Sequence, residues 1–166
     1  MAVKPVVLYP DPLLKKISKK IESINEYINN LINDLVDTMD AFDHSVGISA
    51  PQLGENVRII VIDASKNKKC TKHHGRLTLI NPEIKNKEGL IIFREGCMSV
   101  PDYTGNVNRA ESVQVDYYDT NFEKKSLCAE DFEAVLLQHE IDHLDGILFL
   151  DRIISKRTDL FRRKKY

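Results

Sequence analysis

The sequence predicts an α+β fold in which short antiparallel strands surround a central helix, with a second, amphipathic helix nearer the N-terminus. Two observations carry this prediction. Apolar residues recur every three or four positions in two separate segments, 24–42 and 132–143, which is typical of helices with a buried face. Elsewhere, short runs rich in β-branched and aromatic residues are separated by polar turns. Short strands combined with two separate helices favour α+β over an alternating α/β architecture.

The composition is that of a globular protein. The chain has 166 residues, of which 42% are apolar and 30% charged, so we expect one domain over residues 1–166. The net charge of −1 gives no global field for nucleic acid. No apolar run approaches the length of a membrane span, and the N-terminus resembles neither a secretory signal nor a transit peptide. Three unpaired cysteines fit a reducing compartment, so we expect a cytoplasmic protein, bacterial in the first instance or else from an organelle.

The first third of the chain contains an extended arm and a helix. Prolines at 10 and 12 exclude a regular helix at the start, so residues 1–22 are expected to be extended with a turn there. Ser23 and Glu26 match a capping box that would begin the amphipathic helix. Residues 44–54 are rich in Gly and Pro and read as a loop.

Strands are predicted at 57–62, 77–80, 90–93, 113–118 and 125–128, and a last one at 147–150. A polar loop at 67–75 joins the first two. From about residue 152 the chain becomes a short basic tail, which carries Arg152, Lys156, Arg157, Arg162, Arg163, Lys164 and Lys165 against the single acid Asp159. Such a tail is either solvated or a docking segment.

The central helix carries the most informative motif. His139 and His143 are four residues apart and share one face, so both imidazoles can reach a single metal ion. Glu140 is rotated by about 100° from His139 and lies beside such an ion, where it can handle protons. Gly146 follows the last periodic residue and suits a left-handed C-cap. The competing interpretation is a pair of satisfied core histidines.

The third metal ligand must come from elsewhere in the chain. One metalloprotease class places a third His six residues after the second, but Phe149 occupies that position. Another class uses a downstream Glu, and none follows Glu140. The best upstream candidate is Cys97, because one thiolate and two imidazoles leave a fourth tetrahedral position for water. The alternative for Cys97 is a small buried apolar residue.

Three stretches of the chain resemble the signature motifs of the peptide deformylase family. They are Gly47 to Gly54 (GISAPQLG), Glu95 to Ser99 (EGCMS) and His139 to Gly146 (HEIDHLDG), in the family's order. The sequence near Val7 to Pro12 and near Leu150 to Ile153 matches as well. The chain departs from the family pattern at Ser45, where many members have Gly, and at Ser49, where they usually have Ala.

The resemblance implies a metal-dependent hydrolase that removes the N-formyl group from the N-terminal formylmethionine of new polypeptides and releases formate. It implies one divalent ion, with Fe(II) as the first expectation and Zn(II) or another divalent ion as alternatives. The implied metal ligands are Cys97, His139 and His143, and the implied catalytic groups are Glu140 as proton carrier, the Gln52 side chain, the Met98 backbone N–H and Gly47. The implied substrate-binding residues are Val46, Gly47, Ile48, Gly96, Val135 and Leu136, with His139 completing the methionine pocket.

Several further expectations follow from the resemblance. The peptide should lie extended and pair with Gly47 and with the loop after Cys97. Arg109 is expected to form a structural ion pair or hydrogen bonds near the site. The expected partners are formyl-Met nascent chains and, through the basic tail, the ribosome. The competing function is that of another His-Glu-x-x-His metallopeptidase, which would cleave internal peptide bonds.

Overall fold

A computed structural model describes residues 2–163 of the chain. Its helices α1 (Glu26–Asp40) and α2 (Asp131–Leu144) coincide with the two predicted helical segments. The strands of the described residues are β1 Gly47–Ser49, β2 Ile59–Asp63, β3 Arg76–Glu88, β4 Ile91–Cys97, β5 Val100–Arg109, β6 Ser112–Tyr118, β7 Lys124–Glu130 and β8 Leu160–Arg162. The fold is therefore α+β, as predicted.

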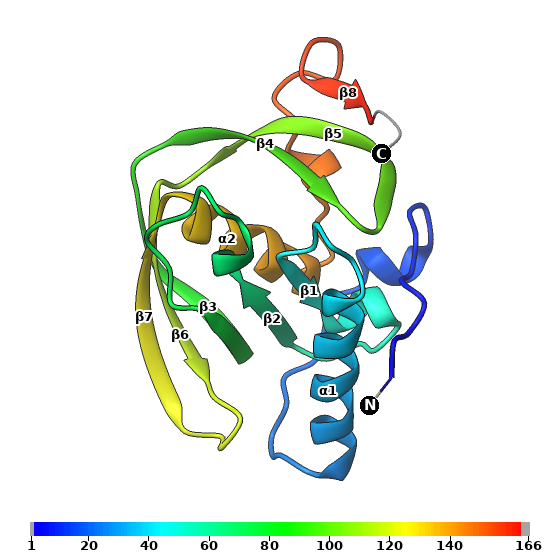
Figure 1. Ribbon diagram of the computed structural model, residues 1–166, viewed down its shortest axis with the longest axis vertical. Coiled ribbons are helices and arrows are strands. Elements are labelled where there is room, and N and C mark those ends of the chain that lie inside the picture. The colour runs from blue at the N-terminus through cyan, green and yellow to red at the C-terminus, as the bar shows by residue number, and fades with distance from the viewer. Residues whose placement is uncertain (1, 164–166) are drawn as a thin grey trace.

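The strands form two antiparallel sheets. One has five strands in the order β1-β2-β3-β6-β7, and the other has three in the order β4-β5-β8. Figure 1 shows α2 between the five-stranded sheet and the curved β4–β5 hairpin, with α1 below. The predicted metal-binding motif on α2 therefore lies at the centre of the molecule, where both sheets can contribute side chains to it.

Strand β2 explains how the two helices are held. Successive side chains of a strand point to opposite faces. Ile60 and Ile62 point into the core shared with α2, whereas Ile59 and Val61 point into the core shared with α1. All four side chains are fully buried, and each contributes roughly 1.5–3 kcal/mol of transfer free energy. Because both faces of β2 are covered, its position fixes α2 against the sheet.

Helix α2 is buried around its circumference. Every residue from 133 to 144 is buried, including the polar ones. The helix ends at Leu144, and Gly146 has a left-handed backbone with φ of +71°, which confirms the predicted role of this glycine. A Cβ on Gly146 would collide with the main chain of Lys15, so the glycine also allows the N-terminal arm to pass close by.

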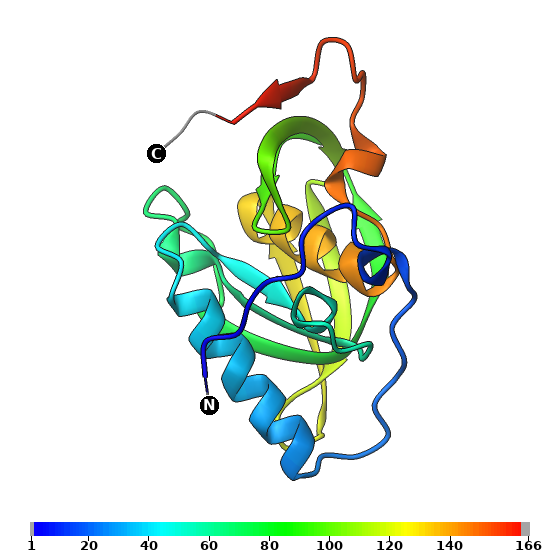
Figure 2. The same cartoon turned by 90° about the vertical axis from the view of Figure 1, so that its right-hand side faces the viewer.

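The C-terminal segment does not follow the prediction. The expected strand at 147–150 is wrong, because Phe149–Arg152 forms a 3-10 helix whose Phe149 side chain is buried beside Cys97. The chain then returns as β8 and pairs with β5, so part of the predicted tail is folded onto the sheet (Figure 2). Lys164 and Lys165 of the predicted tail lie outside the described residues.

Smaller differences occur elsewhere. Asn25, and not Ser23, caps α1, since its side-chain oxygen accepts a hydrogen bond of 2.9 Å from the Ile28 N–H. Strand β1 lies in a segment that was expected to be a loop, β5 was not predicted as a strand, and β3 extends well beyond the predicted 77–80. Within residues 2–163, neither helix has the length and apolar character needed to cross a membrane.

Candidate active site

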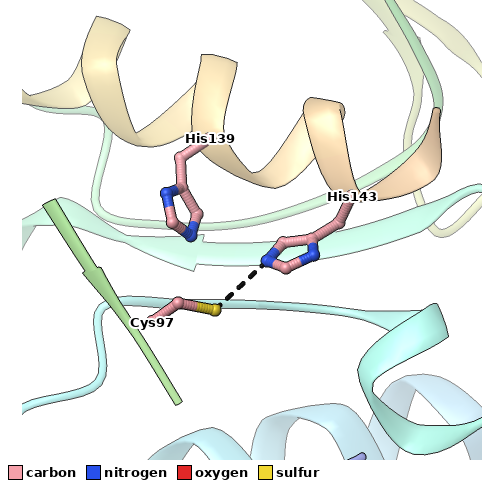
Figure 3. Close-up of side chains that lie close together, drawn as sticks. All are labelled: Cys97, His139 and His143. Carbon is pink, nitrogen blue, oxygen red and sulfur yellow. Dashed lines mark hydrogen bonds between the residues drawn. The ribbon is translucent and has the colours of Figure 1, made fainter. Parts of the chain in front are cut away.

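The three predicted metal ligands lie together. Cys97 ends strand β4, while His139 and His143 project from successive turns of α2, and Figure 3 shows the three side chains converging. Their ligand atoms all lie within 4.8 Å of one another, and Cys97 Sγ is 3.4 Å from His143 Nε2. All three residues are buried. In residues 2–163 this is the one cluster of three or more His, Cys or acidic residues with the spacing of a metal site.

The geometry fits a tetrahedral ion. Metal–nitrogen bonds of about 2.1 Å and metal–sulfur bonds of about 2.3 Å at tetrahedral angles separate neighbouring ligand atoms by roughly 3.4–3.6 Å. The 3.4 Å separation of Cys97 Sγ and His143 Nε2 falls in this range, and no pair of ligand atoms is more than 4.8 Å apart. Thiolate and imidazole are also donors that suit a borderline divalent ion. The residues present therefore fit a metal with three protein ligands.

A buried ion pair orients the first histidine. The Nδ1–H of His139 donates to Glu95 Oε1 at 2.7 Å, which leaves Nε2 to face the cluster. Glu95 is held in turn by two hydrogen bonds from Arg109, of 2.6 and 2.7 Å. Burial raises the pKa of Glu95, but the hydrogen bonds from Arg109 and His139 outweigh it and lower this pKa to about 2. Glu95 is thus an anion that fixes the tautomer of His139.

The same network continues behind α2. Arg109 Nη1 donates to Asp142 Oδ2 at 2.6 Å, and Arg152 binds the same carboxylate with two hydrogen bonds of 2.6 and 3.0 Å. The predicted structural ion pair of Arg109 is confirmed. Sequence reasoning missed Glu95 in this role, although a signal existed: residues two apart on a strand share a face, so Glu95 lies on the same side of β4 as Cys97.

The electrostatic environment also suits a cation. Burial lowers the pKa of His143 well below its ordinary value, so this imidazole is neutral and able to coordinate. Burial has the same effect on His139, but Cys97, Glu140 and Glu95 together raise its pKa well above the ordinary value. The negative groups that favour a proton on His139 favour a metal ion in the same place.

Glu140 is placed for proton transfer. Its Oε2 lies 4.0 Å from His139 Nε2, and its buried Oε1 has no hydrogen-bond partner among residues 2–163. A buried carboxylate oxygen without a partner is rare and indicates a group that binds there during function. Burial raises the pKa of Glu140 to about 7, which is the value a general base needs near neutral pH.

Gly47 allows Glu140 to lie where it does. An added Cβ on Gly47 would stand 2.7 Å from Glu140 Oε2 and 2.9 Å from Leu136 Cδ1. The backbone of β1 therefore approaches α2 more closely than any side chain allows.

The amide of Gln52 has a fixed orientation. Its Oε1 accepts hydrogen bonds of 3.0 Å from both the N–H and the hydroxyl of Ser49. Because a backbone N–H can only donate, the amide atom that faces Ser49 must be the oxygen. The Nε2 end donates to Ser99 Oγ at 3.1 Å and lies 3.5 Å from Cys97 Sγ. Gln52 is 1% exposed and presents its N–H groups to the ligand cluster. Met98 is the first of the two residues that join β4 to β5.

A cleft of about 1010 Å³ opens onto this cluster. Most of the predicted catalytic and binding residues line it, namely Val46, Gly47, Gln52, Gly96, Cys97, Met98, Val135, Leu136, His139 and Glu140. Ile48 does not, since its side chain is fully buried in the core shared with α1. Sequence reasoning missed Phe42 and Arg163, which also line the cleft.

Comparison with known proteins agrees with this geometry. The family model described as polypeptide deformylase matches residues 3–159. The chain belongs to the polypeptide deformylase family. A peptide deformylase of Desulfotalea psychrophila is 39% identical over 99% of this chain and 95% of the relative, and one of Thermodesulfovibrio yellowstonii is 40% identical over 99% and 97%. A crystal structure of a peptide deformylase from Legionella pneumophila has 40% identity and a TM-score of 0.84, covering 94% of this chain and 88% of that one.

Membership settles the class of reaction. The chain is a peptide deformylase, a hydrolase of a metal-dependent family, and nothing in the comparisons supports the alternative of another His-Glu-x-x-His metallopeptidase. The substrates of this family are formylated nascent polypeptides.

Proposed function

We propose that this chain removes the formyl group from formyl-Met polypeptides with one divalent ion held by Cys97, His139 and His143. The observation that carries the proposal is the convergence of these three ligands beside Glu140, whose buried Oε1 has no hydrogen-bond partner among residues 2–163. Cys97, His139 and Glu140 all line one cleft. A divalent ion in this position supplies Lewis acidity and lowers the pKa of water towards neutrality.

Glu140 is the proposed proton carrier. It takes a proton from the water that attacks the formyl carbon and passes this proton to the amine nitrogen as the carbon–nitrogen bond breaks. The products are formate and a free α-amino group, and Glu140 returns to its anionic form. Its near-neutral pKa allows it to accept and release the proton within one cycle.

Gln52 and Met98 are proposed to stabilise the oxyanion that develops on the formyl oxygen. Gln52 Nε2 faces the ligand cluster, and its carbonyl end is anchored by Ser49, so no reorganisation is needed when charge develops. The second donor is the backbone N–H of Met98. One such preorganised donor contributes roughly 3–4 kcal/mol to transition-state stabilisation.

The open edge of β1 is the proposed docking line for the peptide. Asp63 N–H donates to Val46 O at 2.7 Å, and antiparallel pairs alternate, so Gly47 turns its N–H and C=O away from β2. An extended peptide can add to this edge. Val135, Leu136 and His139 then enclose the methionine side chain. A peptide deformylase of Acinetobacter baumannii, with a TM-score of 0.85 and 32% identity, has been crystallised with Met-Ala-Ser bound.

The other proposed substrate contacts involve Gly96 and Ile48. Gly96 is exposed on β4 beside Cys97, where the peptide would pass. Any contact of Ile48 with substrate would be made by its main chain, since its side chain belongs to the core.

We propose Fe(II) as the working ion, with Zn(II) or another divalent ion as the alternative. A thiolate and two imidazoles accept either metal. An iron enzyme loses activity during aerobic purification, whereas a zinc enzyme does not. Equal activity of aerobic and anaerobic preparations would therefore favour zinc.

The deciding experiment measures formate release from formyl-Met-Ala-Ser by anaerobically prepared, Fe(II)-loaded protein. Release that a chelator abolishes and that added metal restores is the expected result. The matched control is acetyl-Met-Ala-Ser, which a site shaped for formyl should leave intact. No release from folded, metal-loaded protein would contradict the proposal.

We also propose a cytoplasmic location and contact with the ribosome. The three cysteines are free, which fits a reducing cytoplasm. Lys156 and Arg157 are exposed near the C-terminus and are available for contact with ribosomal RNA. Salt-sensitive co-sedimentation with ribosomes, lost in the Lys156→Gln/Arg157→Gln double variant, is expected. Sedimentation that is absent or unaffected by salt would remove this idea.

A further inference from the structure

The C-terminal segment brings a cationic side chain to the rim of the substrate cleft. Strand β8 pairs with β5, and the Arg163 N–H donates to Asp102 O at 2.8 Å just after it. Figure 2 shows this segment, in red, running beyond the β4–β5 curve. The Arg163 side chain lines the cleft, although it is 66 residues from Cys97 in the sequence.

Two glycines accommodate the segment. A Cβ on Gly96 would occupy the space of the Arg163 guanidinium, which lies directly against β4 beside the ligand Cys97. A Cβ on Gly105 would collide with the Ile153 side chain and stand 3.0 Å from Asp159 O. The contact between this segment and the hairpin is therefore built into β4 and β5, and it places Arg163 beside a proposed substrate-binding residue.

A second cation is held next to it. The Arg94 guanidinium lies 4.0 Å above the ring of Phe161 on β8, and its Nε donates to Thr104 Oγ1 at 3.1 Å. Arg94 also lines the cleft. We name Arg94 and Arg163 the cationic wall. Strand β8 thus positions Arg94 through Phe161, and the residue that directly follows β8 is the second arginine of this wall.

The charges at the rim are unbalanced. Among residues 2–163, the other cations that line the cleft are Lys68 and Lys66, and Lys66 is paired with Asp40 at 3.7 Å. The acidic residues of this range that line the cleft are Asp43 at the rim and Glu95 and Glu140 in the buried floor. Glu95 is already paired with Arg109. An anionic group entering the rim would therefore meet mainly positive charge.

We propose that the cationic wall makes the cleft select formyl-Met peptides that carry an acidic side chain one or two residues after the methionine. Gly96 is the chain neighbour of Cys97 and contacts the Arg163 guanidinium. An extended peptide advances about 3.3 Å per residue, so the first residues after a methionine held at the ligand cluster would pass beside this arginine. The inference rests on the proposed function and adds a substrate preference to the same cleft.

The test compares kcat/KM for formyl-Met-Ala-Glu-amide and formyl-Met-Ala-Gln-amide, which differ in one charge and carry no terminal carboxylate. The wild-type protein is expected to favour the Glu peptide about two- to fivefold, as a partly exposed ion pair contributes, through KM more than kcat. This ratio should fall towards one in 0.5 M NaCl. Arg163→Gln should remove it, Arg163→Glu should invert it, and Arg163→Lys should retain most of it.

Arg162→Gln is the matched control, because this neighbouring arginine is exposed and does not line the cleft. Its ratio should equal that of the wild type. Equal rates for both peptides in the wild type, or a preference that Arg163→Gln retains, would overturn the inference while leaving the proposed function intact. Absence of formate release from both peptides would instead overturn the proposed function, and the inference with it.

Discussion

The variant Gly47→Ala tests whether the close approach of β1 to α2 sets the position of Glu140. The new methyl group would stand 2.7 Å from Glu140 Oε2, about 0.8 Å short of the roughly 3.5 Å at which such atoms pack comfortably. It would also stand 2.9 Å from Leu136 Cδ1. Glu140 and Leu136 both belong to α2, which is buried on all sides and therefore has little room to move. The carboxylate must therefore move by most of an ångström.

A displacement of this size has a calculable effect. A misplacement of about 1 Å of a catalytic group costs up to about 100-fold in rate, so kcat for formate release should fall roughly 10- to 100-fold. Overpacking should lower the free energy of unfolding by about 1–3 kcal/mol. Bound metal should stay at the wild-type level, because the three atoms nearest to the new methyl group belong to Glu140 and Leu136 and not to the proposed ligands.

Gly75→Ala provides the control. Gly75 has a φ of +71°, and no heavy atom of residues 2–163 outside its two chain neighbours lies within 4 Å of its added Cβ. The substitution therefore strains the backbone at a residue that does not line the cleft. It should cost about 1–2 kcal/mol of stability and leave kcat unchanged. A folded, metal-loaded Gly47→Ala protein with kcat within twofold of the wild type would refute the reasoning.

Three further predictions concern the groups around the ion. Glu140→Gln should retain bound metal, measured by elemental analysis, and lose about 10²- to 10⁴-fold in kcat; near-normal turnover would exclude Glu140 as the proton carrier. Arg109→Gln leaves Glu95 and Asp142 without their buried cation. Chemical denaturation should then show that the free energy of unfolding falls by about 3–5 kcal/mol, and metal titration should show 10- to 100-fold weaker metal binding. Unchanged metal affinity would show that this network does not act on His139. Ser49→Ala removes one of the two hydrogen bonds that orient the Gln52 amide, so kcat should fall about two- to tenfold while KM and the melting temperature stay unchanged. If Ser49→Ala lowers kcat by the same factor in a Gln52→Ala background, Ser49 does not act through Gln52.

The fold was predictable where side-chain pattern and local structure agree. Both helices and the β-branched strands follow directly from periodicity. Strand β5 was missed because Pro101, Gly105 and its Asp and Asn residues disfavour strands, and pairing with β4 and β8 outweighs that tendency. The apolar run at 147–150 read as a strand, but burial of Phe149 beside Cys97 bends it into a 3-10 turn.

The candidate site was predictable only in part. Helical spacing alone brings His139, Glu140 and His143 to one place, because four residues make one turn. Cys97 and Gln52 come from other elements, and no local pattern predicts that they meet α2. Cys97 became a candidate because the downstream positions offer no third ligand, whereas the role of Gln52 came from the resemblance to a known family. The position of Arg163 in the cleft was not predicted, because it depends on the pairing of β8 with β5, two strands that are far apart in the sequence.

The all-round burial of α2 has a consequence for the time scale of the site. A helix whose backbone is shielded on every side exposes its amides mainly when the whole molecule unfolds, so hydrogen exchange at 139–143 should be among the slowest in the protein. Local fraying then cannot release the ligands one at a time from the helix side. Metal entry, metal loss and adaptation to different peptides are therefore left to the mouth of the cleft, where residues 41–44 are exposed and free of regular structure.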